Sequence, residues 1–357
     1  MTPVEQSSPS WPWSSWFAAA GLYLNTASCG LPPRPTVQAL AAVHDDWAAG
    51  RVTASQFDDD VAAARASFAR LVGVDPSWVA VGHQVSPLVG LVAAALPAGS
   101  QVLVATGDFT SVTFPFLAQA HRGIEVLEAP VERLAEAVGP QVSLVAVSLV
   151  QSADGAVLDL DAVLEAAAAH GAEVLLDLTQ AAGWLPVDAS RVGYTVCGAY
   201  KWLLSPRGTA FMTVRPDLVD GIVPVNAGWY AGREVWDSIY GLPLRLAEDA
   251  RRLDTSPAWF SWVGTRSSLA FLEDVGTGAA HEHALRVERA FCTAAGLEPL
   301  GRAIRALDVD AVASETLATR GVVAATRAGR LRVSFHVSTD EDAVAELGAA
   351  LRGHVTG

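Results

Sequence analysis

The sequence predicts an α/β protein in which helices cover both faces of a mostly parallel β-sheet. Along the first three quarters of the 357 residues, short apolar runs alternate with segments of helical periodicity. Two of these runs, "SLVAVSLV" and "EVLLDL", are apolar almost without interruption, which is typical of strands buried on both faces. Alternation and unbroken runs together favour a parallel sheet between two helical layers. Hydrophobic residues make up 51% of the chain, which is sufficient for a large core.

The predicted elements follow one another in a regular order. Residues 1–15 are rich in Ser and Pro, and we expect a loose tail whose tryptophans dock on an apolar surface. Apolar spacing predicts helices over 36–50 and 58–73, the second ended by Gly73. Strands are expected at 78–82, 101–106, 124–129, 142–150, 173–178 and 208–214. Further helices are expected between them at 86–96, 111–122 and 160–171.

The pattern changes in the last quarter of the chain. A helical stretch over 278–296 is followed by short strands, among them "LRVSFHV", and by a last helix in "DEDAVAELGAALRG". We therefore expect a large α/β domain over 16–275 and a smaller α+β domain over 276–357.

Charge and cysteine content narrow the possible partners and the compartment. The net charge is −14 and there is no basic run, so nucleic acid and anionic membranes are not expected as partners. No apolar run has the length of a membrane span, and the first residues lack the pattern of a signal peptide. Three widely spaced cysteines form no zinc pattern and favour a reducing cytoplasm.

Two charged residues mark the end of the predicted sheet at which ligands bind. Asp177 closes the strand "EVLLD", and Lys201 follows 24 residues later, just before the strand at 208–214. That interval can hold a turn, a short strand and a loop back to the same edge, where α/β proteins bind ligands. Desolvation lowers the pKa of a buried lysine, whose amine can then form a Schiff base with an aldehyde cofactor. A carboxylate nearby keeps a pyridine nitrogen protonated, so the pair is the minimum apparatus for pyridoxal phosphate. Taken singly, Asp177 is equally explained as a helix cap and Lys201 as a surface residue.

The stretches "DLTQAAG" and "CGAYKWLLSPRGTAF" resemble the class V aminotransferase family, which belongs to the fold type I enzymes dependent on pyridoxal 5'-phosphate (PLP). Four further stretches fall in the family's order: "YLNTASCGLPP", "VGHQVSPLVG", "GDFTSVTFPF" and "LRVSFHVSTDEDA". The resemblance runs from about residue 20 to the C-terminus. It implies a mostly parallel seven-stranded sheet between helices, a smaller C-terminal α+β domain, a PLP cofactor and a homodimer.

The resemblance also implies roles for individual residues around the cofactor. Lys201 would form the Schiff base, Asp177 would pair with the pyridine nitrogen, and Gln180 would reach the ring hydroxyl. The other matching positions are Phe109, stacked on the ring; His83 and Gln84, in the turn that holds the phosphate before the helix at 86–96; Ser152, beside the ring oxygen; Arg332, on the substrate carboxylate; and Asn25, in the loop over the substrate.

The sequence departs from the family at the expected phosphate site. Tyr200 stands before the lysine where the family often has His, so one hydrogen-bond donor remains but a positive charge is lost. Gly198 replaces the usual Ser. Phosphate binding is therefore expected to draw on the backbone or on a partner subunit, with Ser256 as the candidate residue borrowed across the dimer.

The family resemblance leaves several reactions open and disfavours one. Cysteine desulfurases carry a reactive Cys shortly before the substrate arginine, but no Cys lies between Cys292 and Arg332. We therefore expect a PLP enzyme acting at Cα of an amino acid or amine, as aminotransferase, lyase or epimerase, and not a Cys-dependent desulfurase. The alternative is a non-catalytic or assembly protein that retains the fold. A nicotinamide dehydrogenase is disfavoured because Gly-x-Gly-x-x-Gly is missing after the first strands.

Overall fold

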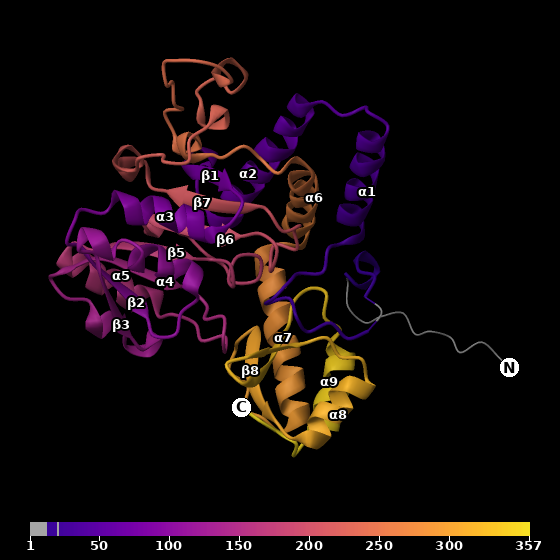
Figure 1. Ribbon diagram of the computed structural model, residues 1–357. Coiled ribbons are helices and arrows are strands. Elements are labelled where there is room, and N and C mark those ends of the chain that lie inside the picture. The colour runs from indigo at the N-terminus through magenta and orange to yellow at the C-terminus, as the bar shows by residue number, and fades with distance from the viewer. Residues whose placement is uncertain (1–12, 20) are drawn as a thin grey trace.

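A seven-stranded sheet forms the centre of the molecule, in a computed structural model that describes residues 13–19 and 21–357 (Figure 1). Its strand order is β1-β7-β6-β5-β4-β2-β3, and every strand except β7 runs in the same direction. The strands are β1 (Val79–Gly82), β2 (Gln101–Ala105), β3 (Glu125–Ala129), β4 (Val142–Ser148), β5 (Glu173–Asp177), β6 (Tyr194–Gly198) and β7 (Ala210–Val214). The predicted mostly parallel sheet is confirmed.

Strand β7 is antiparallel because of the short connection that precedes it. Only residues 199–209 join β6 to β7, and a parallel crossover needs a dozen or more residues. The chain therefore turns back at the edge where β6 ends, and Lys201 lies in that turn. β6 is the short strand expected between Asp177 and Lys201.

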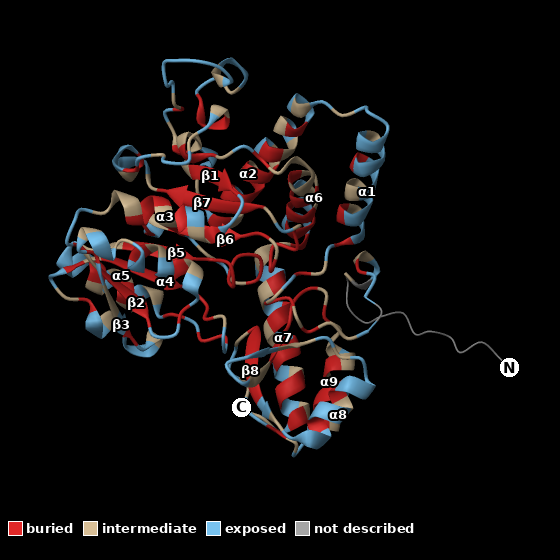
Figure 2. Cartoon of the chain, viewed as in Figure 1, coloured by how far each residue is buried: buried red, intermediate tan, exposed pale blue. Residues whose placement is uncertain are grey.

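The large part of the molecule has two hydrophobic clusters, one on each face of the sheet. The central strands between them are buried (Figure 2). Successive residues of β4 alternate between them: Val145 and Val147 belong to one cluster, Leu144 and Ala146 to the other. Because both faces of the strand are buried, both sets of residues are apolar, as the unbroken run predicts. The covering helices are α1 (Arg34–Ala48), α2 (Asp58–Val72), α3 (Val85–Ala95), α4 (Thr110–Leu117), α5 (Leu160–His170) and α6 (Trp259–Val275).

Local sequence explains where these helices begin and end. Three aspartates in the first turn of α2 favour its N-terminus, and Gly73 ends it with a left-handed φ of 76°. Asp159 caps α5 by accepting a hydrogen bond from the N–H of Ala162. The helix predicted over 111–122 is shorter than expected: α4 ends at Leu117, two residues after Pro115, and a separate 3-10 turn follows.

The C-terminal part has its own sheet and its own core. A four-stranded antiparallel sheet, ordered β11-β8-β10-β9, packs with three helices, and α7 contacts α9 extensively. The elements are α7 (Thr277–Ala295), β8 (Ile304–Val309), α8 (Ala311–Thr319), β9 (Ala325–Arg327), β10 (Arg330–Ser334), α9 (Glu341–Leu351) and β11 (Val355–Thr356). This agrees with the smaller α+β region expected from the sequence.

The N-terminal segment connects the two parts. The N–H of Leu24 donates to Val323 O, at 2.8 Å, and the N–H of Ser334 donates to Leu24 O, at 2.9 Å. Leu24 belongs to the core of the C-terminal part, and a few residues later the N–H of Gly30 donates to Tyr200 O. Residues 22–24 thus pair with residues of the C-terminal part, although they come before residue 275. The division of the chain into two domains at residue 275 stays a prediction.

The end of the predicted tail docks on apolar helices, as far as it is described. Trp16 packs against Phe271, and Trp13 meets His283 edge-on. Residues 1–12, and with them Trp11, lie outside the described residues. None of the helices in 13–19 and 21–357 is long and apolar enough to cross a membrane.

Candidate active site

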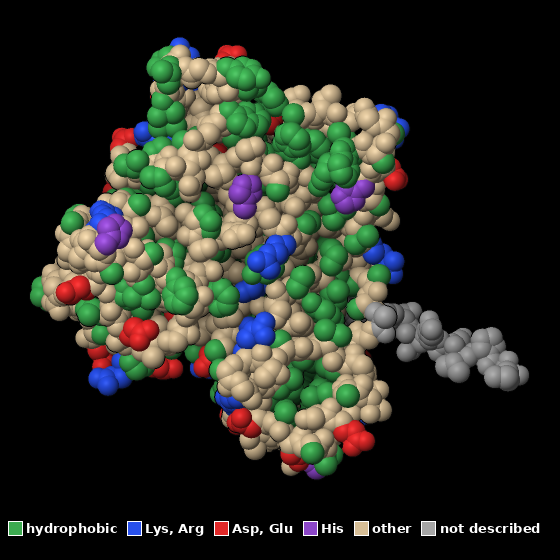
Figure 3. All heavy atoms as spheres, viewed as in Figure 1, with side chains coloured by type: hydrophobic (Ala, Val, Ile, Leu, Met, Phe, Trp, Pro, Cys, Tyr) green, Lys and Arg blue, Asp and Glu red, His purple; other side chains and the backbone are tan. Residues whose placement is uncertain are grey.

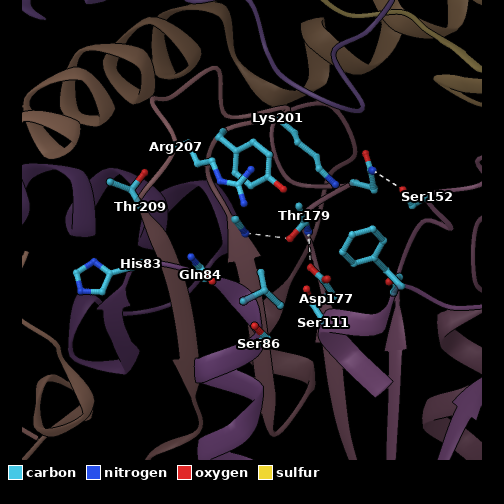
Figure 4. A pocket seen from close by; sticks show the side chains of 16 residues that line it. His83, Gln84, Ser86, Ser111, Ser152, Asp177, Thr179, Lys201, Arg207 and Thr209 are labelled. Carbon is cyan, nitrogen blue, oxygen red and sulfur yellow. Dashed lines mark hydrogen bonds between the residues drawn. The ribbon is translucent and has the colours of Figure 1, made fainter. Parts of the chain in front are cut away.

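A cavity of about 330 Å³ opens where β4, β5 and β6 end and α3 begins (Figure 4). Its volume is within the range of small-molecule sites, and its position is the carboxyl edge of the parallel strands. The lining residues are His83, Gln84, Val85, Ser86, Phe109, Ser111, Ser148, Ser152, Asp177, Thr179, Gln180, Gly198, Tyr200, Lys201, Arg207 and Thr209. Eight predicted site residues are among them; Asn25, Ser256 and Arg332 are not.

Asp177 lies at the floor of the cavity, fully buried at the end of β5. One carboxylate oxygen accepts the N–H of Thr179 at 2.8 Å, and the Thr179 hydroxyl accepts the N–H of Gly198 at 2.9 Å. These bonds tie the end of β5 to the end of β6 and fix the carboxylate. Burial raises the pKa of Asp177 to about 6, although its hydrogen bonds with Thr179 and the charge of Lys201 oppose the rise.

Lys201 extends into the same cavity from the turn between β6 and β7, with only 6% of the residue exposed. Burial lowers its pKa to about 8, and the charge of Asp177 opposes this shift. The turn is fixed by the bond from Gly30 N–H to Tyr200 O, at 2.9 Å. Only glycine fits at position 30, because a Cβ there would collide with the carbonyl oxygen of Lys201. The amine is therefore both desolvated and held in place.

Phe109 lies beside the lysine amine, with its ring centroid 5.2 Å from Nζ. Its position depends on Asp108, a buried residue that the sequence analysis missed. The Asp108 carboxylate accepts the N–H of Phe109 at 2.7 Å, and it also accepts both the N–H and the hydroxyl of Ser148. The available signal was a second Asp just beyond the carboxyl end of a buried strand, as with Asp177.

The opposite end of the cavity carries the residues that suit an anion. Helix α3 starts after Gln84, whose side chain makes no capping bond, so first-turn N–H groups are left for a ligand. The His83 ring lies at the margin of the cavity, on the side away from Lys201 (Figure 4), with Nε2 at 3.2 Å from the Thr255 hydroxyl.

Arg207 supplies a positive charge at this end, and the sequence analysis missed it. Its side chain points into the cavity (Figure 4), and its guanidinium carbon is 5.3 Å from the centroid of the Tyr200 ring. It forms no ion pair within the part of the chain that the structure describes. The family often has a positively charged His at the position of Tyr200. The Arg207 guanidinium lies next to Tyr200 and so supplies a positive charge near the position where the His is missing.

A polar network joins the wall of the cavity to the C-terminal part. Gln180 donates its two amide hydrogens to Ala27 O and to the Ser152 hydroxyl, at 3.0 and 2.9 Å, and accepts the indole N–H of Trp202. Arg332 donates to the carbonyl and the hydroxyl of Ser152, at 2.6 and 3.0 Å. Arg332 therefore lies directly behind a cavity-lining residue.

Two further predicted residues lie outside the cavity. The carbonyl of Asn25 accepts the N–H groups of Ser28 and Cys29, which makes the turn beside Arg332, and its amide oxygen has no partner among the described residues. Ser256 is exposed. The residue before it, Thr255, donates its N–H to Val81 O. Its role across a dimer interface stays a prediction.

Comparison with known proteins shows the family to which the chain belongs. Residues 22–300 match the family model described as "Aminotransferase class-V". The chain belongs to the class V aminotransferase family. It is 29% identical to the uncharacterized aminotransferase YcbU of Bacillus subtilis (strain 168), over 76% of this chain and 78% of that protein. It is 30% identical to isopenicillin N epimerase of Streptomyces clavuligerus, over 72% of this chain and 70% of that protein.

A solved structure has the same fold as this member of the family. The cystine C-S lyase C-DES, in complex with its reaction product cysteine persulfide, superposes with a TM-score of 0.84. It covers 94% of this chain and 98% of its own, at 21% identity, so the likeness concerns the fold. The predicted fold type I architecture is confirmed.

PLP is the cofactor of this family, and the cavity of the present chain suits it. An amine, a buried carboxylate and an aromatic ring lie at one end, whereas a helix N-terminus and a guanidinium lie at the other. This donor set matches an aldehyde, a protonated pyridine, a flat ring and a phosphate, respectively. Lys201, Asp177, Phe109, Gln84 and Arg207 are thus the residues that could hold PLP.

Proposed function

We propose that this protein is a PLP-dependent enzyme that acts at Cα of an amino acid or amine, with Lys201 as its catalytic amine. The observation that carries the proposal is a lysine amine with its pKa lowered to about 8, buried in a cavity whose floor is the Asp177 carboxylate. A desolvated amine is a nucleophile and a base near neutral pH, whereas an exposed lysine is neither.

When bound, PLP supplies an aldehyde that reacts with amines and a pyridine ring that withdraws electrons from the adjacent carbon. Asp177 would hold a proton at the pyridine nitrogen, because a buried carboxylate beside a cation favours the ionised pair. Phe109 would cover the ring and exclude water. Lys201, once released by an incoming amine, would take the proton from Cα of the substrate and return one to it.

Arg332 would orient the substrate through its carboxylate. Its guanidinium is fixed by Ser152 and Ser28, and a fixed fork of donors suits a carboxylate. Tyr200, Gln84, His83 and Arg207 would hold the phosphate, while Ser152 and Gln180 would lie near the ring oxygen. With PLP bound, the place to which Lys201 returns the proton would decide between transamination and epimerisation, and a substrate with a leaving group at Cβ would allow elimination. The chemistry of the site is compatible with each of these.

Persulfide chemistry on a cysteine is not part of the proposal. Cys197 and Cys292 are buried, and burial raises the pKa of both thiols, so neither forms a thiolate readily. Cys29 is exposed on the turn beside Asn25 and is the thiol that a test must address.

We also propose that the enzyme is a cytoplasmic homodimer. The segment between β7 and α6 projects from the large part (Figure 1) and exposes apolar side chains, among them Leu242 at 94%. Exposed apolar clusters of this kind mark protein interfaces. The cysteines that the structure describes are free thiols, which is expected in a reducing compartment. The mass of the purified protein by light scattering tests the dimer.

The decisive experiment uses the purified protein and the Lys201→Met variant. The wild type should show a visible absorption band with PLP, and borohydride should bleach the band and leave the cofactor mass on the peptide that contains Lys201. Lys201→Met should show no cofactor mass on that peptide after borohydride, and any band that it keeps should differ from that of the wild type. Screening amino acids then separates the reactions: formation of pyridoxamine phosphate indicates transamination, release of ammonia and a keto acid indicates elimination, and loss of optical rotation indicates epimerisation. A wild-type protein that binds PLP but processes no amine would favour the non-catalytic alternative.

A further inference from the structure

Two arginines from the C-terminal part converge on one hydroxyl beside the cavity. Arg332 donates to Ser28 Oγ at 2.7 Å, and Arg327 donates to the same atom at 3.3 Å. Arg332 lies on β10 and Arg327 on the neighbouring strand β9, whereas Ser28 lies in the N-terminal turn about 300 residues away in the sequence. Because both groups donate to one oxygen atom, the two guanidinium groups are immediate neighbours.

This pair has no negative counterpart within the described part of the chain. The ion pairs found there involve neither Arg327 nor Arg332. Burial lowers the pKa of Arg332 to about 10, and the charge of Arg327 adds to the shift. Both arginines also disfavour the charged form of Lys201. Three cations therefore act on one another at the same side of the cavity.

The cationic cluster contrasts with the net charge of the whole chain, which is −14. On the face shown in Figure 3, some Lys and Arg side chains lie near the centre, between the large and the small part, and others lie nearer to the outline, where most of the Asp and Glu side chains are found. Such an arrangement lowers the free energy of an anion at the entrance and speeds its approach.

The two arginines differ in depth. Arg332 is 2% exposed, and bonds to Ser152 and Ser28 fix both of its terminal nitrogens. Arg327 is exposed and ends its strand just before Ala328 and Gly329, which both have positive φ angles and make a tight turn. Arg332 is therefore the deeper of the two, behind Ser152, and Arg327 is the outer one. If Arg332 takes the inner end of a substrate, as in the proposed function, Arg327 is placed for the outer end.

Ser28 is arranged to receive an anion between them. Its oxygen accepts from both arginines, so its two lone pairs are used and its own proton is left to donate. A hydroxyl proton and two guanidinium groups all favour a negatively charged acceptor, and charge-assisted hydrogen bonds are the strong ones.

We propose that Arg327 binds a second anionic group of the substrate, so that the substrate is an amino acid whose side chain ends in a carboxylate or a sulfur oxyacid. This rests on the proposed function, in which Arg332 takes the α-carboxylate. One carboxylate offsets the charge of Arg332, and a second negative group beside Arg327 would offset the repulsion between the two guanidinium groups.

The test measures binding without relying on turnover. The holoenzyme is titrated by calorimetry with succinate, glutarate and adipate, and with butyrate, valerate and hexanoate as monocarboxylates of matched length. At least one dicarboxylate should bind about tenfold more tightly than its monocarboxylate, and Arg327→Gln should remove that advantage while leaving monocarboxylate binding unchanged. Arg332→Gln should weaken both series. Arg320→Gln, at an exposed arginine after α8, is the matched control and should leave both unchanged.

Amino acids then link the binding to the proposed reaction. The cofactor absorption of the holoenzyme should respond to aspartate, glutamate, 2-aminoadipate or cysteate at concentrations about tenfold lower than to asparagine, glutamine or alanine. Equal responses to acidic and neutral amino acids, or equal losses of both carboxylate series in Arg327→Gln, would overturn the second anion site and leave the proposed function intact. A holoenzyme that binds dicarboxylates but whose absorption responds to no amino acid would support the anion site and overturn the proposed function.

Discussion

Asp108 accepts both the backbone N–H and the hydroxyl of Ser148, at 2.8 and 2.6 Å, and so joins the ends of two neighbouring strands. Because the same carboxylate accepts the N–H of Phe109, the aromatic ring beside Lys201 is placed by the ends of β2 and β4 rather than by the loop alone. Asp108 is therefore a positioning residue of the cofactor site.

The Asp108→Asn variant should lower both stability and cofactor affinity. Both carboxylate oxygens of Asp108 accept hydrogen bonds, and in the variant an NH2 group replaces one of them and faces a donor. A buried polar group left without a partner costs about 1–3 kcal/mol. We expect a lower melting temperature of the apoprotein and a shifted absorption maximum of the holoenzyme, since the ring beside the cofactor moves. The exposed Glu132→Gln is the control. An unchanged spectrum together with a lower melting temperature would mean that the residue acts on stability alone.

The lowered pKa of Lys201 makes the stability of the apoprotein depend on pH. Between about pH 8 and 10.5 the unfolded chain keeps a proton on this lysine that the folded chain has lost, so folding stability should rise with pH in that window. The Lys201→Met variant should lack this rise. Between pH 7 and pH 11 the free energy of unfolding of the wild type should increase by about 3 kcal/mol more than that of the variant. Urea unfolding at a series of pH values measures it. Parallel curves for the two proteins would show that the amine is not desolvated.

Replacing Arg207 should weaken the binding of PLP through its phosphate. Loss of the guanidinium in Arg207→Gln is expected to raise the dissociation constant of PLP about tenfold, with no change for pyridoxal, which has no phosphate. Arg207→Lys should recover part of the affinity because the charge is restored. Arg233→Gln is the matched control, since Arg233 pairs with Glu248 on the surface. An equal loss for PLP and pyridoxal would place Arg207 at the ring instead.

The Cys29→Ser variant tests the exclusion of desulfurase chemistry. Cys29 is exposed, whereas the other two thiols are buried, so it is the thiol that a substrate sulfur could reach. We expect Cys29→Ser to keep the activity of the wild type toward every amine that the enzyme processes. Release of sulfide from L-cysteine by the wild type, lost in Cys29→Ser and kept in Cys292→Ser, would refute the exclusion.

The sequence predicted the strands and the meeting of Asp177 and Lys201 at the carboxyl edge of the sheet, because each depends on local patterns. Asp177 closes an apolar run, and Lys201 stands in a motif that the family shares. The residues that were missed depend on how distant segments meet. Arg207 contacts the ring of Tyr200, and Asp108 accepts a hydrogen bond at the end of β4. Arg327 donates to Ser28, near the other end of the chain. None of these contacts can be read from a local pattern. The reversed direction of β7 follows from the length of one connection.

The bond between Ala27 and Ser334 spans 307 residues, and it has a consequence for how the protein is made. At roughly 5–20 residues per second, a ribosome needs roughly 15–60 seconds between these two positions. During that time the first-made segment waits without its partners, Val323 and Ser334, while the central sheet assembles. The contacts of Arg327 and Arg332 with Ser28 and Ser152 can therefore form only after translation of the chain is nearly finished.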